Sequence, residues 1–175
     1  APGVARIAVL LSHHFKALPE AVHVIDPERS RSDAAADPWV RELFRLAGSE
    51  AGQLGYPLRT EFEFDQDAAR GFLRRAESSD AQAIVLGHPL TKRAPEFERI
   101  VDFVAQRSAC PVVVAKFGRS LSASRILVPV RSLEELAVLT PYFMAMTQVA
   151  GEIITIFYLA PGETPARDLD RIREQ

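Results

Sequence analysis

Short apolar runs separated by amphipathic stretches make up most of the chain. Several of these runs are typical of strands covered on both faces of a parallel sheet: residues 6–11 (RIAVLL), 21–25 (AVHVI), 83–86 (AIVL), 111–117 (PVVVAKF), 125–130 (RILVPV) and 153–159 (IITIFYL). One further stretch, 58–64 (LRTEFEF), alternates apolar and polar residues, which predicts a half-exposed strand at a sheet edge.

Between the runs, apolar residues recur every three or four positions, which predicts amphipathic helices over 39–54, 68–76, 97–105 and 133–149. Asp37 and Pro38 suit the N-cap and first turn of the helix over 39–54, and Gly55 suits its end. Trp39 lies on the apolar stripe of that helix and is expected in the core. Strands that alternate with helices imply a parallel sheet with right-handed crossovers.

The pattern restarts after a serine-rich joint. Residues 125–130 echo residues 6–11, and a long helix and a further strand follow them. We therefore predict a first repeat over 1–118, a joint at 119–124 and the opening part of a second repeat over 125–175.

The first repeat has a short first connection. It holds about twelve residues fewer than the second repeat between its first two predicted strands, whereas a parallel connection needs about a dozen or more. Either the first crossover is degenerate, or residues are absent between Ser12 and Val22. We favour the second explanation.

Composition fits a soluble globular protein of one domain, or of one domain and part of another. The chain has 175 residues, 47% of them hydrophobic and 25% charged, with a net charge of −2. This balance argues against a nucleic-acid partner, and no apolar run approaches the roughly 18 residues that span a bilayer. The single cysteine, Cys110, suits a reducing compartment, so we expect a cytoplasmic location.

Two segments resemble the universal stress protein family. The stretch AIVLG followed by FERIVDFVAQRSACPVVVAK resembles the closing half of such a domain, including Cys110-Pro111-Val112 after the helix. The stretch from Arg125 to Pro161 resembles the opening half of another. The resemblance implies an α/β fold: an open, parallel, five-stranded sheet of order 3-2-1-4-5 with helices on both faces, followed by the start of a second copy.

The family's nucleotide motif is degenerate in this chain. ATP-binding members carry G-x-x-G, a spacer, and then G-S or G-T, because glycines let backbone N–H groups approach the phosphates at a helix N-terminus. Here Gly87 matches the first glycine, but Leu90 stands at the second. The Gly-Ser pair is replaced by Glu98 and Arg99, and the Asp expected after the first strand is replaced by Ser12-His13 in one copy and by Arg131 in the other. We expect no tight ATP binding and no cofactor.

The remaining candidates are weak. A vestigial ligand pocket would be lined by Ser12, His13, Gly87, His88, Lys92 and Arg99. Adjacent His13 and His14 suit a metal poorly, so we predict no metal site. Because no nucleophile has a base beside it in the sequence pattern, we predict that the chain is not an enzyme.

Three functions stay open. The first is a non-catalytic regulatory or assembly domain, since the family's degenerate tandem copies are found fused to the C-terminus of membrane transporters of cations, chloride or amino acids. That hypothesis places the chain at the inner face of the cell membrane, joined to a transmembrane domain of the same polypeptide. The alternatives are a free-standing tandem protein acting by dimerisation, or a nucleotide or anion sensor with a remodelled pocket.

The predicted strand over 111–117 is the reason to expect a homodimer. Val112, Val113 and Val114 form a β-branched run in the strand that the family places at the far sheet edge. An exposed edge presents unpaired backbone groups and must be covered or paired. We expect a second chain to pair with it, although cover from the joint or from the second copy would serve the same purpose.

Overall fold

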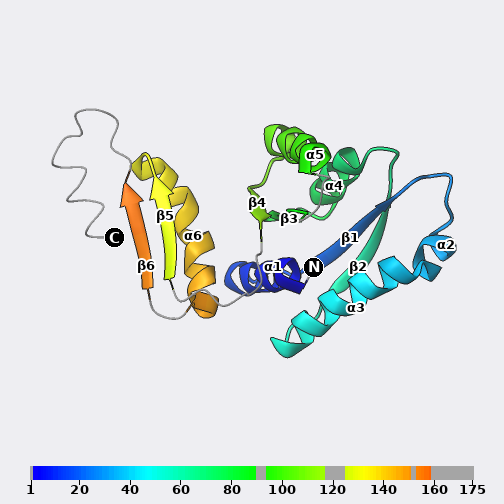
Figure 1. Ribbon diagram of the computed structural model, residues 1–175, viewed down its shortest axis with the longest axis horizontal. Coiled ribbons are helices and arrows are strands. Elements are labelled where there is room, and N and C mark those ends of the chain that lie inside the picture. Colours follow the sequence, from blue (N-terminus) through cyan, green and yellow to red (C-terminus); the bar gives the residue numbers. More distant parts are fainter. Residues whose placement is uncertain (1, 90–93, 117–124, 151–152, 159–175) are drawn as a thin grey trace. The chain divides into compact units, whose positions relative to one another are not determined.

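The computed structural model describes residues 2–89, 94–116, 125–150 and 153–158, and divides the chain into two compact units, Ala1–Arg119 and Ser120–Gln175. Figure 1 shows the elements, which are described unit by unit. The elements of the first unit are α1 (Pro2–Phe15), β1 (Glu20–Ile25), α2 (Arg31–Ala36), α3 (Pro38–Gln53), β2 (Arg59–Phe64), α4 (Ala68–Ser78), β3 (Ile84–Gly87), α5 (Ala94–Arg107) and β4 (Val112–Ala115). Those of the second are β5 (Arg125–Val130), α6 (Leu133–Ala150) and β6 (Ile153–Tyr158).

The first predicted strand is a helix. Residues 6–11 lie in the middle of α1, a continuous helix of 14 residues. Val9, Leu10 and Leu11 are buried there, because α1 packs against both α3 and β3. A run buried on several sides is apolar all round, and its period cannot distinguish a helix from a strand. The strand prediction over 6–11 is therefore wrong.

The helix also explains the short first connection. Phe15 ends α1, and β1 begins at Glu20 after a short turn. The stretch between Ser12 and Val22 thus holds the end of α1, a short turn and the start of β1.

The strands of the first unit form two separate parallel pairs. β1 pairs with β2, with Glu20 opposite Arg59 and Ile25 opposite Phe64. β3 pairs with β4, with Ile84 opposite Val112. β1 and β3 are not hydrogen-bonded to each other, so the described residues do not form the predicted five-stranded sheet of order 3-2-1-4-5. The physical reason is that residues 6–11, the expected central strand, are helical.

Helices lie on both sides of these strands. α1 packs on α3, and α4 packs on β1, β2 and α5 (Figure 1). The helix predicted over 39–54 is confirmed as α3: the Asp37 side chain accepts a hydrogen bond from Trp39 N at 2.9 Å, and Gly55 follows the helix with a φ of 72°. Trp39 itself is 63% exposed, so the prediction that it lies in the core is wrong. It stands in the first turn, where α3 begins.

One buried cluster of the first unit lies between α4, α5 and the β3–β4 pair. Its buried members are Ala69, Ile84, Leu86 and Val104. α4 approaches β1 closely, since a Cβ added to Gly71 would stand 2.6 Å from Val24 Cγ1. Glycine is therefore required at this contact.

The second unit is a strand, a helix and a parallel strand. β5 and β6 pair along their whole length, from Arg125 opposite Ile153 to Val130 opposite Tyr158. α6 covers them, and Val128, Val130, Leu136 and Phe143 form the buried cluster. These elements match the strands and the helix predicted there.

Candidate functional site

The predicted pocket centres on the carboxyl end of β3, where parallel sheets commonly bind ligands. Gly87 is the last residue of β3. A Cβ added to it would lie 2.6 Å from Val4 Cγ2, so the first turn of α1 stands directly against this strand end. Gly87 corresponds to a phosphate-binding glycine of the family motif. In this chain, its lack of a side chain instead leaves room for the first turn of α1.

His88 follows and is held by backbone contacts. Its backbone N–H donates to the carbonyl oxygen of Ala115 at 2.8 Å, and the ring Nδ1 lies 2.8 Å from the carbonyl oxygen of Pro89. The half-buried ring meets the ring of Phe97 edge to face, with centroids 5.3 Å apart. These contacts fix His88 between β3 and the start of α5, which is a packing role.

The start of α5 is acidic. Glu96 lies in its first turn, and the exposed Glu98 and Arg99 follow on the same helix. Carboxylates near a helix N-terminus stabilise the helix, but they repel a phosphate that would bind there. Sequence reasoning missed Glu96. Leu90 and Lys92 lie outside the described residues.

Ser12 and His13 lie on the last turn of α1. Ser12 is buried, and its Oγ donates to the carbonyl oxygen of Ala8 at 2.7 Å. The His13 ring stands edge to face with Tyr56 at 5.4 Å. The helix rises about 1.5 Å per residue, so Ser12 lies about 12 Å along the axis from Val4, the residue beside Gly87. Among the described members of the predicted pocket, Gly87 and His88 adjoin at the end of β3, whereas Ser12 and His13 lie on the last turn of α1. Binding at these residues stays a prediction.

The predicted pairing edge is open in the described part of the chain. There, β4 is hydrogen-bonded to β3 and to no other strand. Val112 and Val113 are half-buried, and Val114 is 42% exposed. One row of backbone groups along β4 is thus available to a further strand.

An aromatic cluster that the sequence pattern did not indicate covers the β1–β2 pair. His23 stands opposite Phe62 in the register, and its ring meets the exposed Trp39 at 5.8 Å. Partial burial of His23 lowers its pKa, although the nearby carboxylate of Asp37 acts in the opposite direction. The alternating pattern placed Phe62 and Phe64 on one face but gave no reason to join them to His23.

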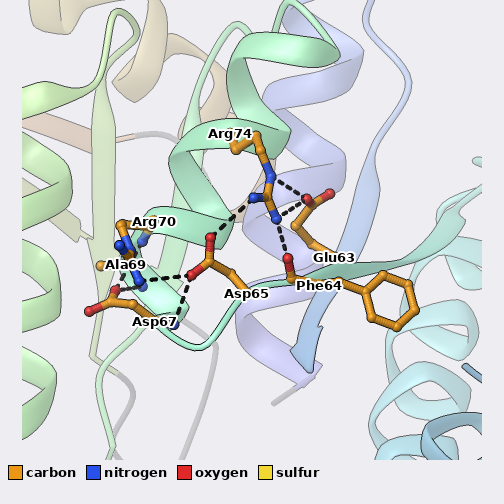
Figure 2. A network of polar contacts seen from close by, with 7 residues as sticks. All are labelled: Glu63, Phe64, Asp65, Asp67, Ala69, Arg70 and Arg74. Carbon is orange, nitrogen blue, oxygen red and sulfur yellow. Dashed lines mark hydrogen bonds and ion pairs between the residues drawn. The ribbon is translucent and has the colours of Figure 1, made fainter. Parts of the chain in front are cut away.

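A second missed feature is the polar network that joins β2 to α4 (Figure 2). The Arg74 guanidinium donates to Glu63 Oε1 at 2.7 Å and to Asp65 Oδ2 at 3.2 Å, and also reaches the carbonyl oxygen of Phe64. One arginine therefore binds three consecutive residues at the end of a strand.

Asp65 and Asp67 complete this connection. Asp67 caps α4, its Oδ1 accepting from the N–H groups of Ala69 and Arg70. Asp65 Oδ1 accepts from Asp67 N at 2.9 Å and lies 3.4 Å from the guanidinium of Arg70. The backbone hydrogen bond and the two arginines lower the pKa of Asp65. The network fixes the turn; it holds no nucleophile.

Comparison with models of protein families identifies the family of this chain. The model of the universal stress protein family matches residues 1–116 of the 175. The chain belongs to the universal stress protein family. Universal stress proteins are generally regulatory and non-catalytic. No curated protein matches the chain.

Two solved structures show the same fold at low identity. A universal stress protein in complex with cAMP is 15% identical, with a TM-score of 0.53 over 64% of this chain and 86% of that chain. A functionally unknown protein from Pseudomonas aeruginosa PAO1 is 17% identical, with a TM-score of 0.54 over 95% of this chain. The chain spans 58% of that protein's length. These similarities support the universal stress protein-like α/β fold.

Metal binding and the surroundings of the single cysteine can also be checked in the described residues of this universal stress protein. No cluster of three or more metal-ligating side chains occurs among the described residues. Ser108 Oγ donates to the carbonyl oxygen of Cys110 at 2.7 Å and lies 3.4 Å from its sulfur. None of the described helices is both long and apolar enough to cross a membrane.

Proposed function

We propose that the chain is a non-catalytic regulatory and assembly domain that forms a homodimer through β4. The open edge of β4 carries the proposal, because its backbone groups are bonded to β3 on one side only within the described residues. A second copy of the same strand satisfies that edge by pairing with it.

The side chains of β4 suit such pairing. Val112, Val113 and Val114 are β-branched, and Val114 is 42% exposed on a strand of four residues. A symmetric antiparallel pair would bring the two Val114 side chains close to the two-fold axis. The interaction is isologous, so it closes as a dimer instead of extending to a fibre.

We further propose that the dimer serves a longer polypeptide in the cytoplasm. The resemblance of the two sequence segments to tandem domains fused to secondary transporters supports this, and a transmembrane domain of the same polypeptide would then be the partner. In that setting the homodimer would hold two transporter subunits together at the inner face of the membrane. A free-standing tandem protein would use the same dimer without the membrane partner.

The domain acts without tight ATP binding. The side chain of Val4 fills the space beside Gly87. Glu96 and Glu98 place negative charge at the start of α5. Both features oppose a triphosphate, one sterically and one electrostatically.

A nucleotide or anion sensor is the second candidate. The solved universal stress protein in complex with cAMP favours it, since that structure shares the fold of this chain. Its ligand would bind near Gly87 and His88, with Lys92 and Arg99 as the cations of the proposed pocket.

Disulfide trapping tests the proposed dimer. Val114→Cys, made in a Cys110→Ala background, should give a disulfide-linked dimer under mild oxidation, because the two strands meet near this residue. The matched control is Val138→Cys, which replaces an exposed valine of α6. Equal, slow cross-linking of both variants would contradict pairing through β4.

A further inference from the structure

Two exposed aromatic rings lie on the α3 side of the β1–β2 pair. Phe62 and Phe64 share one face of β2 by alternation, and the Phe62 ring contacts Phe44 of α3, with centroids 5.5 Å apart. Phe64 is 37% exposed at the end of the strand, and its ring is directed away from Arg74 (Figure 2). Trp39, in the first turn of α3, is 63% exposed. Large apolar groups that are exposed together commonly mark a surface that binds another molecule.

His23 joins these rings into one surface. It stands opposite Phe62 in the register of β1 and β2, with ring centroids 6.2 Å apart, and its ring meets Trp39 at 5.8 Å. Burial lowers the pKa of His23, so the imidazole is neutral near pH 7.5 and repels no cation. We call His23, Trp39, Phe62 and Phe64 the aromatic surface.

A guanidinium of the chain itself already lies on this surface. The Arg31 Cζ atom is 5.8 Å from the centroid of the Phe62 ring, and Nη2 of the same arginine is 3.2 Å from Glu61 Oε2. The arginine thus contacts an aromatic face and a neighbouring carboxylate of the same strand. The aromatic surface is therefore chemically suited to arginine.

The segment before α3 carries an excess of negative charge. Residues 26–37 contain four carboxylates and two guanidinium groups, which gives a net charge of −2. Both cations are engaged within the chain, since Arg29 pairs with Asp37 at 3.5 Å and Arg31 pairs with Glu61. The excess belongs to three exposed carboxylates, those of Asp26, Glu28 and Asp33.

Hydrogen bonds tie this acidic segment to Trp39. Asp37 Oδ1 accepts from Trp39 N at 2.9 Å, and Asp37 Oδ2 lies 3.5 Å from Nη2 of Arg29. α2, which lies within the segment, packs on α3. A ligand on the Trp39 ring would therefore lie in the field of a net negative segment. Such a field attracts cations and opposes a polyanion such as nucleic acid.

We propose that the aromatic surface docks a basic segment of a partner polypeptide, with an arginine side chain of that segment stacked on the exposed Trp39 indole. A further cation of the segment is attracted by the carboxylates of residues 26–37. Arginine suits this place better than lysine, because its planar guanidinium stacks on a ring and still donates hydrogen bonds from its edge. The inference does not depend on the pairing of β4.

Trp39 is the single tryptophan of the chain, so its fluorescence reports this surface directly. The probe is acetyl-Gly-Arg-Gly-Arg-Gly-amide, added to the full chain at pH 7.5 and low salt. We expect a saturable change in emission with a dissociation constant of about 1 mM or below. Binding should weaken when the ionic strength rises from about 0.01 M to about 0.15 M. Emission that stays unchanged up to about 10 mM peptide would overturn the proposal.

Three other probes test the chemistry of the occupant. The matched lysine peptide should bind about two- to fivefold more weakly than the arginine peptide, because its ammonium stacks less well on a ring. The matched leucine peptide and an oligothymidylate should give no saturable change. Leucine or lysine peptides that bind as tightly as the arginine peptide, or tighter binding of the oligonucleotide, would contradict docking through arginine.

Two charge reversals locate the negative field. Glu28→Lys should weaken binding of the arginine peptide about threefold or more, since it reverses a charge beside the aromatic surface. The matched control is Glu77→Lys, an equal change of net charge at an exposed position in the last turn of α4, which packs on the opposite face of the β1–β2 pair. Equal weakening by both substitutions would show an effect of net charge alone and would refute the site.

Trp39→Leu tests the stacking itself, with the amide NMR shifts of Glu28 and Asp33 as the readout in place of fluorescence. The parent chain should show saturable shifts with the arginine peptide, and the variant should lose them. Undiminished binding by the variant would contradict stacking on Trp39. Should the variant fail to fold, the contrast between the arginine and lysine peptides on the parent chain still decides.

Discussion

Gly71 of α4 lies directly over Val24 of β1, and a Cβ at Gly71 would stand 2.6 Å from Val24 Cγ1 and 2.8 Å from Cγ2. The contact allows α4 to rest on the β1–β2 pair. Valine is branched at Cβ and has little freedom to turn aside, so the position tolerates no side chain.

Gly71→Ala is therefore expected to lower the free energy of unfolding by about 1–3 kcal/mol, the usual cost of overpacking. Gly48→Ala is the control, since Gly48 lies in α3 with nothing within 4 Å of an added Cβ. That change should raise stability by about 0.4–1 kcal/mol, because alanine reduces the freedom of the unfolded chain. Urea denaturation measures both. Equal effects would contradict the contact, and Val24→Ala should partly rescue Gly71→Ala.

Arg74→Gln should loosen the turn between β2 and α4. The substitution removes the contacts to Glu63, Phe64 and Asp65 shown in Figure 2. We expect the midpoint of thermal unfolding to fall by about 2–4 °C. Arg45→Gln serves as the control, because Arg45 makes one exposed pair with Glu42 and such pairs contribute little. The network has only a minor role if the two variants unfold at the same temperature.

His23 should make stability depend on pH. Its pKa in the folded chain is lowered, chiefly by burial, so the unfolded chain binds the proton more readily. The stabilising contribution is complete above the unfolded pKa of about 6.5 and is lost as pH falls through the folded pKa. His23→Gln should therefore lose less stability than the parent between pH 7 and pH 5.

Urea denaturation at pH 7, 6 and 5 checks this, with His14→Gln, a change at an exposed histidine, as the control. Parallel pH profiles for the parent and His23→Gln would show that His23 has no such effect.

The alternation of strands and helices after residue 20 could be predicted from the sequence because their signals are local. Asp37-Pro38 and Gly55 mark the ends of α3, and the short apolar runs at β3 and β4 are too short for helices. Residues 6–11 gave the wrong element because Val9, Leu10 and Leu11 are buried by tertiary contacts that no local pattern contains. Because residues 6–11 were the expected central strand, the strand order 3-2-1-4-5 is not observed among the described residues.

The candidate site was predictable only in part. The degenerate nucleotide motif could be recognised from Gly87 and Glu98, because both residues stand at positions of the family's G-x-x-G and G-S pattern. The cluster of His23 with Trp39 and the Arg74 network join residues from different elements. Their residue types are ordinary for solvated surfaces, and only the fold brings them together.

Calorimetry with Mg-ATP should detect no binding tighter than about millimolar. Leu90→Gly combined with Glu98→Gly and Arg99→Ser should recover some affinity, since these changes restore the glycines and the hydroxyl of the family motif. The same titration with cAMP tests the sensor hypothesis. A micromolar dissociation constant for either ligand in the parent chain would show that the pocket is functional.

The oligomeric state of the chain tests the assembly function most directly. Light scattering at about 50 μM should show a homodimer, because an edge that pairs specifically should be largely occupied at this concentration. Val114→Lys should convert it to a monomer, since a charged side chain in β4 disfavours pairing. Val138→Lys, at a valine of α6 that is 60% exposed, should remain dimeric. A parent chain that is monomeric at this concentration, or a dimer that Val114→Lys leaves intact, would contradict the account.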